Sequence, residues 1–209
     1  MTEVAGVLLA AGESRRMGST NKMTLSIGGP SLLRHAAEVL CSSRLAEIVA
    51  VVGHAAPEAE GLLAGLPQVR TVRNADYAQG QMSSVQCGLQ NLSRSYEGIM
   101  ICLADQPLLT AHDVDALIDT FLGQERRPIL VPTYQGRRGN PIVLSAMHQA
   151  TILADGTANF GCRRLIERHP QWITTVEMAN DHVVFDVDTP EDCQEWRRRL
   201  GQSAVAGRR

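Results

Sequence analysis

Residues suited to binding a phosphate gather in a turn of small side chains near the start of the chain. The turn covers residues 9–18, reads L-A-A-G-E-S-R-R-M-G, and is followed by Lys22. Small side chains let backbone N–H groups approach an anion, and Arg and Lys side chains add positive charge. The spacing fits neither a P-loop nor a dinucleotide-binding glycine fingerprint, and a solvated surface loop stays open as the alternative. The candidate nucleotide-binding residues here are Leu9, Ala10, Ala11, Gly12, Arg15, Arg16, Gly18 and Lys22.

Three acidic residues suit a metal site. Asp105 comes shortly after an apolar run, where a carboxylate serves no packing purpose. Asp186 and Asp188 lie two positions apart near a strand predicted over 182–187, and alternate residues of a strand share a face. Like charges on one face repel unless a cation or N–H groups meet them. We expect Asp105, with Asp186 or Asp188, to hold Mg²⁺; a turn or cap role is the alternative for Asp105 and for one of the other two.

A polar loop at residues 74–84 leads into a predicted helix. The start of that helix carries Ser83 and Ser84, and a helix N-terminus favours a phosphate or another polar group of a ligand. Asn74 and Ser84 are the candidate contacts to the nucleotide or its acceptor. Ordinary helix capping by either serine explains the pattern equally well.

Strand-like and helix-like patterns alternate along the chain. Such alternation predicts an α/β fold, with a mostly parallel central sheet, helices on both faces, and the binding crevice at the carboxyl ends of the strands. We expect one domain over residues 1–200 and a frayed tail over 201–209, which shows no periodicity. The strands are predicted at 4–9, 47–52, 69–72, 98–103, 129–131, 141–144, 173–177 and 182–187. The helices are predicted at 30–40, 57–66, 83–92, 110–122, 158–168 and from 189 onward.

Composition narrows the class of protein. The 209 residues are 44% apolar and 20% charged, as in a folded soluble chain, and we expect a cytoplasmic protein. A net charge of −2 and 4% aromatic residues argue against nucleic acid as a partner. The sequence contains no apolar run long enough to cross a membrane and no signal-peptide pattern, so no membrane partner is expected. Five scattered cysteines fit neither a disulfide framework nor a zinc site, and Met82, Met100 and Met147 are expected in the core.

Read in order, five segments resemble the nucleotidyltransferases that act on molybdopterin. They span about residues 4–192, nearly the whole chain. The cytidylyltransferase branch is the nearer one, because the guanylyltransferase branch usually reads L-A-G-G in the first loop and has asparagines at positions 186 and 188. The matching segments are the opening turn with N-K at 21–22, G-Q-M-S-S with G-L at 80–89, L-A-D-Q-P at 103–107, R-G-N-P at 138–141, and D-V-D-T-P-E-D at 186–192.

The resemblance implies a Rossmann-like nucleotidyltransferase fold and the transfer of CMP from CTP to the phosphate of molybdopterin, with release of pyrophosphate. It implies Mg²⁺ as cofactor and Lys22, Asp105 and Arg16 as catalytic residues, and it makes a molybdoenzyme or its chaperone a possible partner. Asn140 and Asn159 replace a His and an Asp of the family pattern, in the half expected to face the acceptor. GTP as donor, another small phosphate acceptor, and a non-catalytic protein that delivers the cofactor remain open.

Overall fold

The computed structural model describes residues 3–13, 21–26, 29–125, 128–154 and 161–206, and the candidate residues Arg15, Arg16, Gly18 and Asn159 lie outside these ranges. The strands are β1 (Val4–Ala10), β2 (Ile48–Val52), β3 (Val69–Arg73), β4 (Gly98–Leu103), β5 (Ile129–Tyr134), β6 (Arg137–Arg138), β7 (Ile142–Ser145) and β8 (Ile173–Glu177). The α-helices are α1 (Leu32–Cys41), α2 (Ala56–Leu63), α3 (Gln81–Gln90), α4 (Ala111–Leu122), α5 (Gln149–Ala154), α6 (Gly161–Arg168) and α7 (Pro190–Ala206).

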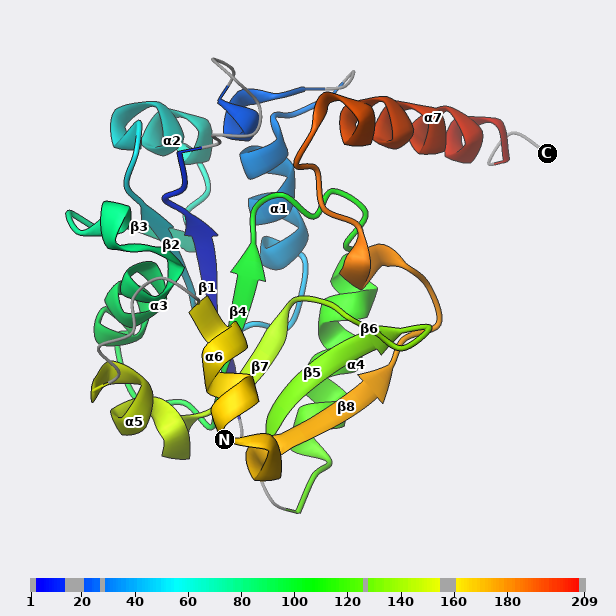
Figure 1. Ribbon diagram of the computed structural model, residues 1–209. Coiled ribbons are helices and arrows are strands. Elements are labelled where there is room, and N and C mark those ends of the chain that lie inside the picture. Colours follow the sequence, from blue (N-terminus) through cyan, green and yellow to red (C-terminus); the bar gives the residue numbers. More distant parts are fainter. Residues whose placement is uncertain (1–2, 14–20, 27–28, 126–127, 155–160, 207–209) are drawn as a thin grey trace.

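One mixed sheet runs through the molecule in the order β3-β2-β1-β4-β7-β5-β6, with β8 paired to β5 (Figure 1). Neighbours from β3 to β4 are parallel, as are β5 and β8, while β7 is antiparallel to both β4 and β5. Because β7 reverses direction between them, β4 and β5 point the same way. The carboxyl ends of β1, β4 and β5 therefore share one edge, and the predicted mostly parallel sheet is confirmed.

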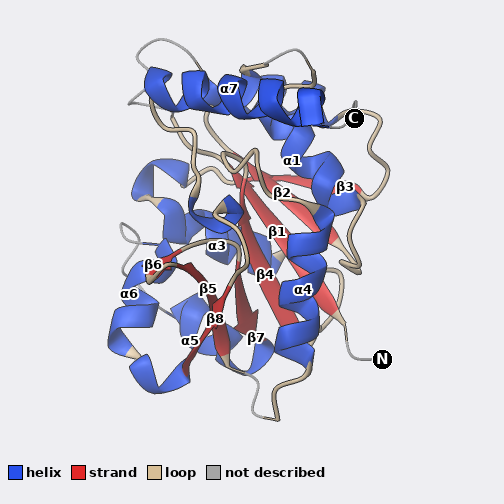
Figure 2. Cartoon of the chain, turned by 90° about the vertical axis from the view of Figure 1, so that its right-hand side faces the viewer, coloured by secondary structure: helices blue, strands red, loops and turns tan. Residues whose placement is uncertain are grey.

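Helices cover both faces of the sheet, as predicted (Figure 2). Every residue of β1 is buried, and successive side chains enter two different cores. Leu8 packs in a cluster with α1, α2 and α4, whereas Val7 packs in a cluster with α3, α5 and α6. Alternation with a period of two produces this division. Full burial of a Leu or Val side chain stabilises the fold by roughly 1.5–3 kcal/mol. The buried strands therefore fix the position of the edge where β1, β4 and β5 end.

The two helices predicted to start at residues 110 and 189 begin there, each with a capping residue. Thr110 caps α4: its hydroxyl accepts from the Asp113 N–H at 3.2 Å, while the Asp113 carboxylate accepts from the Thr110 N–H at 2.9 Å. Thr189 and Asp192 repeat the reciprocal pattern at the start of α7. Both caps satisfy N–H groups that a helix start otherwise leaves without partners. The helix α7 continues to Ala206 and so enters the segment expected to fray.

Two sequence expectations are wrong. Residues 182–187 do not form a strand; His182–Val184 is a 3-10 turn (η7), followed by non-regular chain. Backbone groups there bond to two separate stretches of chain, the residue before Pro141 and the turn after β4: Val183 O accepts from the Asn140 N–H at 2.8 Å and from Gln106 Nε2 at 3.0 Å, and Val187 N–H donates to Asp105 O at 2.9 Å. Such scattered partners preclude a regular ladder. Met147, expected in the core, is 72% exposed, although Met82 and Met100 are buried.

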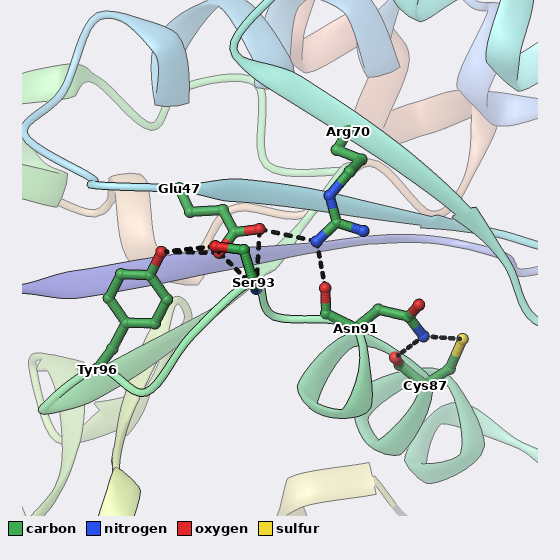
Figure 3. Close-up of polar contacts among 6 residues, drawn as sticks. All are labelled: Glu47, Arg70, Cys87, Asn91, Ser93 and Tyr96. Atoms are coloured by element: carbon green, nitrogen blue, oxygen red, sulfur yellow. Dashed lines mark hydrogen bonds and ion pairs between the residues drawn. The ribbon is translucent and has the colours of Figure 1, made fainter.

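A polar network lies at the opposite edge, before β2 and after α3 (Figure 3). Glu47 accepts from the Arg70 guanidinium at 2.7 Å, from the Ser93 hydroxyl at 2.8 Å and from the Tyr96 hydroxyl at 2.7 Å. Arg70 also donates to the Asn91 carbonyl. The network joins β2 and β3 to the loop that leads into β4.

Among the described helices, none combines the length and apolar character needed to cross a membrane.

Candidate active site

A cavity of about 580 Å³ opens where β1 and β4 end, near their arrowheads in Figure 1. The sequence predicts the site at this edge, and most of the predicted site residues that the structure describes line this cavity. They come from four stretches: the end of β1 with η2 (Lys22–Thr24), the start of α3, the turn after β4, and the segment before α7. The predicted residues that line it are Leu9, Ala10, Ala11, Gly12, Lys22, Ser84, Asp105, Asp186 and Asp188.

Lys22 joins two of the predicted carboxylates. Its ammonium donates to Asp105 Oδ2 at 2.5 Å and to Asp188 Oδ1 at 3.0 Å, across 83 and 166 positions of sequence. The backbone under Lys22 is held by Asn21, whose side chain accepts from the Met23 N–H at 3.1 Å and donates to Glu58 of α2 at 2.8 Å. The N-K pair therefore has a local explanation: the asparagine caps the turn that carries the lysine.

Asp186 and Asp188 both line the cavity, although the predicted strand is absent. Val187 between them is fully buried in a small cluster with Leu32 of α1 and Trp196 of α7. Because the Val187 side chain is anchored away from the cavity, its two neighbours face the opposite side. The expectation that the two carboxylates share a side thus holds for a reason other than strand geometry, namely the apolar anchor.

The crowded carboxylates perturb one another. Burial raises the pKa of Asp186, and the nearby charges of Asp105 and Asp188 raise it further, to about 6, although Gln106 and Lys22 oppose the shift. For Lys22, burial would lower the pKa, but contact with Asp105 and Asp188 outweighs burial and raises it, so the ammonium stays charged. Among the described lining residues, four carboxylates, including Glu13, face one ammonium. The described walls are therefore negative and favour a cation.

The donor set fits a hard divalent cation. Asp105 Oδ1 and Asp186 Oδ1 are buried and lack a hydrogen-bond partner within the described part of the chain. Buried carboxylate oxygens without partners are costly unless a cation or a donor meets them. No three His, Cys, Asp or Glu side chains of the described ranges stand close enough to enclose a metal by themselves. A cation here would complete its coordination with water or phosphate oxygens, as Mg²⁺ commonly does.

Asn74 does not line the cavity. It is buried behind the wall, and its amide nitrogen donates to the hydroxyls of Ser83 and Ser84 at 2.9 and 3.0 Å. Its side-chain oxygen accepts from the Asp76 N–H at 2.9 Å. Asn74 therefore shapes the 74–84 loop, while Ser84 reaches the cavity from α3.

Several lining residues were not among the candidates. A signal existed for five of them, because Glu13 belongs to the small-residue turn and Tyr77, Ala78, Gly80 and Gln81 belong to the polar loop singled out in the sequence. The φ of Gly80 is +114°, a value that favours glycine, and this residue precedes α3 without a side-chain cap. Met23 carried no signal of a chemical role, and Leu103 was marked only as the first residue of the L-A-D-Q-P segment. The lining residues that were not predicted are Glu13, Met23, Tyr77, Ala78, Gly80, Gln81 and Leu103.

Comparison with known proteins gives the family. Nicotine blue oxidoreductase of Paenarthrobacter nicotinovorans is 30% identical over 197 residues, which cover 90% of this chain and 93% of that protein. Purine catabolism protein PucB of Bacillus subtilis (strain 168) is 31% identical over 217 residues, with 93% and 96% covered. The structure of Rv0371c of Mycobacterium tuberculosis H37Rv in complex with manganese superposes with a TM-score of 0.74 at 25% identity, covering 93% of this chain and 97% of that one.

The family model itself covers most of the chain. It is described as the MobA-like NTP transferase domain and matches residues 6–172, a range that includes most of β1, Lys22 and Asp105. The predicted nucleotidyltransferase resemblance and fold are confirmed by this match. The chain belongs to the MobA-like NTP transferase domain family.

Proposed function

We propose that this protein transfers CMP from CTP to the phosphate of a molybdopterin-type acceptor and releases pyrophosphate. One observation carries the proposal: Lys22, Asp105 and Asp188 come from three distant stretches and meet in one cavity. An ammonium between carboxylates at the ends of parallel strands suits the binding of a metal-complexed polyphosphate.

In the proposed reaction, an oxygen of the acceptor phosphate attacks the α-phosphorus of CTP. A new P–O bond forms, the bond between the α-phosphorus and its bridging oxygen breaks, and pyrophosphate leaves with that electron pair. A phosphate monoester is already anionic near neutral pH, so the attack needs no general base. The residues of the site are left with two tasks, which are to hold two anions together and to neutralise charge.

Each described residue then has a role. Asp105, together with Asp186 or Asp188, is proposed to hold the divalent cation: the buried Oδ1 atoms of Asp105 and Asp186 lack a partner among the described residues, and Asp188 lies on the same ammonium as Asp105. When bound, the cation neutralises charge at the α-phosphate. Lys22 binds the β- and γ-phosphates together with the amides around Gly12, and Arg16 is proposed to assist from outside the described residues. The manganese complex of Rv0371c supports a divalent cation, and Mg²⁺ is the proposed one.

The proposal also specifies CTP as the nucleotide and a molybdopterin-type phosphate as the acceptor. CTP is proposed because the loop after β1 reads Leu9-Ala10-Ala11-Gly12, with alanine where the guanylyl branch usually has glycine. Tyr77, Gln81 and Ser84 line the wall available to the nucleoside. The names of the two relatives above do not mention molybdopterin, so the acceptor rests on the ordered sequence motifs.

The test is pyrophosphate release with each of the four NTPs, Mg²⁺ and molybdopterin, repeated with smaller phosphate monoesters. We expect release with CTP and molybdopterin, and loss of release with EDTA. Preference for GTP or for another monoester would correct the donor or the acceptor and keep the reaction. Tight nucleotide binding without release from any pair would indicate a non-catalytic delivery protein and would overturn the proposal.

A redox reaction is the second candidate. The name of the relative from Paenarthrobacter, at 30% identity over nearly the whole chain, favours it. The loop after β1 does not carry the three-glycine dinucleotide fingerprint, which weighs against a nicotinamide dinucleotide in this cavity. Oxidation of NADH or NADPH in the presence of quinone-like dyes, followed by absorbance, tests this candidate in the same preparation.

A further inference from the structure

We propose that Asp113 and His182 form a positioning pair that holds the Asp186–Asp188 segment beside Asp105. The inference rests on the proposed function, because the carboxylates being positioned are those assigned to the cation. It concerns two residues that lie outside the cavity walls and that no sequence motif singled out as functional. The pair joins α4 to the non-regular segment that precedes α7.

Asp113 is the hub of the arrangement. The residue is only 3% exposed, and its carboxylate accepts four hydrogen bonds. Two come from Thr110, at 2.9 Å from the N–H and at 2.6 Å from the hydroxyl, and these fix the start of α4. The other two come from the far segment: Asn180 Nδ2 lies 3.1 Å away and His182 Nδ1 lies 2.8 Å away. Burial would raise the pKa of Asp113, but the bonds from His182, Thr110 and Asn180 lower it, so the carboxylate remains ionised.

The position of α4 along the chain shows which segments the Asp113–His182 pair links. Asp105 lies in the turn directly before the Thr110 cap, and Asp186 lies four residues after His182. One buried carboxylate therefore ties together the two segments that carry the candidate metal ligands. Farther along the segment, the Val187 N–H donates to Asp105 O at 2.9 Å. This bond joins the backbones of the two segments that carry the candidate metal ligands.

The segment is also held by the buried side chains of Val183 and Val187. It lacks a strand ladder, and its remaining anchors include Val183 O, which accepts from Gln106 and from the Asn140 N–H, and Asp181, which pairs with Arg199 of α7 at 2.7 Å. Displacement of a catalytic group by about 1 Å can slow a reaction by two orders of magnitude. Loss of a supporting partner of metal ligands typically costs 10–100-fold in affinity or activity.

The test uses the full chain with His182→Ala, Asp113→Ala and the control His148→Ala. His148 is buried and stacks on Trp172 with ring centroids 4.1 Å apart, and it lies at the opposite edge of the sheet. Turnover per folded molecule, Mn²⁺ affinity by calorimetry and melting temperature are measured for each variant. We expect His182→Ala to lose about tenfold in both kcat/KM and Mn²⁺ affinity. His148→Ala should lower the melting temperature while leaving turnover per folded molecule and Mn²⁺ affinity unchanged.

Added imidazole separates positioning from general destabilisation. The His182 side chain is 29% exposed, so a small molecule can reach the space that alanine leaves. Imidazole should restore part of the turnover of His182→Ala and none of the turnover of Asp113→Ala, which lacks the accepting carboxylate. Turnover of His182→Ala equal to that of the wild type, or a loss that imidazole does not reverse, would overturn the proposal.

Failure of the proposed function gives a different result. If the wild-type protein releases no pyrophosphate with any NTP and acceptor, Mn²⁺ affinity decides for the pair alone. Weaker Mn²⁺ binding by His182→Ala than by the wild type and His148→Ala would support the positioning role. Equal Mn²⁺ affinity in all three, or no Mn²⁺ binding by the wild type, would overturn it.

Discussion

Asp105 is the residue on which the proposed chemistry depends most. Its Oδ2 accepts from Lys22, and its buried Oδ1 has no partner among the described residues. Replacing it by Asn keeps the shape and removes the charge, so the cation loses a ligand while the backbone bond from Val187 survives. We expect Asp105→Asn to lower kcat by about 100-fold or more, with little change in melting temperature.

Pyrophosphate release and thermal denaturation of the same preparation check this prediction. The matched control is Asp119→Asn on α4, an exposed carboxylate that pairs with Arg44 at 2.7 Å and lies outside the cavity. Near-normal transfer by Asp105→Asn would remove Asp105 from the metal site.

Lys22 is expected to contribute to both binding and chemistry. Lys22→Ala deletes the ammonium that contacts two carboxylates, so the described walls become more negative and repel a triphosphate. We expect a higher KM for the nucleotide and a lower kcat, together about 100-fold in kcat/KM, because the charge also supports the leaving pyrophosphate. Steady-state kinetics at saturating Mg²⁺ measure both parameters, and an unchanged kcat/KM would exclude Lys22 from the site.

Residue type and position predicted much of this site. A carboxylate after an apolar strand, and a lysine after a small-residue turn, are informative because parallel strands end at one edge. The internal partners of Asn74 could not be predicted, since they depend on how the 74–84 loop folds back on Ser83 and Ser84. The role of Val187 as an anchor also depends on α7, which a local pattern does not place.

Among the secondary-structure elements, strands and helices with a strong apolar period were predicted to within a few residues. The failure at 182–187 has a physical cause: the apolar residues of that segment pack into different clusters, Val183 with the main core and Val187 with α7. A local pattern cannot distinguish a strand from an extended segment whose hydrogen bonds go to two separate stretches of chain. Tertiary partners decided the conformation, as they often do for short segments.

Packing of α3 against the sheet is testable at one glycine. A Cβ on Gly88 would overlap Val7 Cγ1 of β1 and lie 3.2 Å from Val51 Cγ2 of β2. We expect Gly88→Ala to push α3 from the sheet and destabilise the fold by about 1–3 kcal/mol. It should also raise the KM for the nucleotide, because Gln81 and Ser84 of the same helix line the cavity.

The matched control is Gly61→Ala in α2. Gly61 is exposed, and a Cβ there meets nothing within 4 Å. Alanine in that helix should stabilise by up to about 1 kcal/mol through backbone propensity. Urea denaturation of both variants measures the difference, and equal effects would contradict the close packing of α3.

Across the whole molecule, the carboxyl and amino edges of the sheet differ in their polar contacts. The carboxyl edge gathers like charges and polar atoms that have no partner in the described part of the chain, an arrangement that favours ligands over stability. The amino edge carries the Glu47 network, in which the carboxylate is met by a guanidinium, two hydroxyls and the Ser93 N–H (Figure 3). The Glu47 network therefore stabilises the edge away from the cavity. Variants at the two edges should separate cleanly into those that change activity and those that change stability.

The pH dependence of stability follows from Glu47. Burial would raise its pKa, but bonds from Arg70, Ser93 and Tyr96 outweigh burial and lower the pKa from 4.5 to about 2. Because the carboxyl binds its proton less readily in the folded protein than in the unfolded chain, its contribution to stability is fully present above about pH 4.5. That contribution is lost as the pH falls through the folded pKa, since both states are then protonated.

We expect Glu47→Gln to lower the free energy of unfolding by about 2 kcal/mol at pH 7, a figure reduced from the full linkage value because Arg70 is half exposed. The wild-type and variant curves should converge as the pH approaches 2, and urea denaturation between pH 7 and pH 2.5 measures the approach. Glu60→Gln is the matched control. Glu60 of α2 pairs at 2.6 Å with Arg73, which lies on β3 as Arg70 does, but this ion pair is solvated. The free energy of unfolding of Glu60→Gln should equal that of the wild type within error at every pH. A constant difference between wild type and Glu47→Gln across this range would show that the carboxylate charge does not stabilise the fold, because only the charge disappears with acid while packing and shape remain.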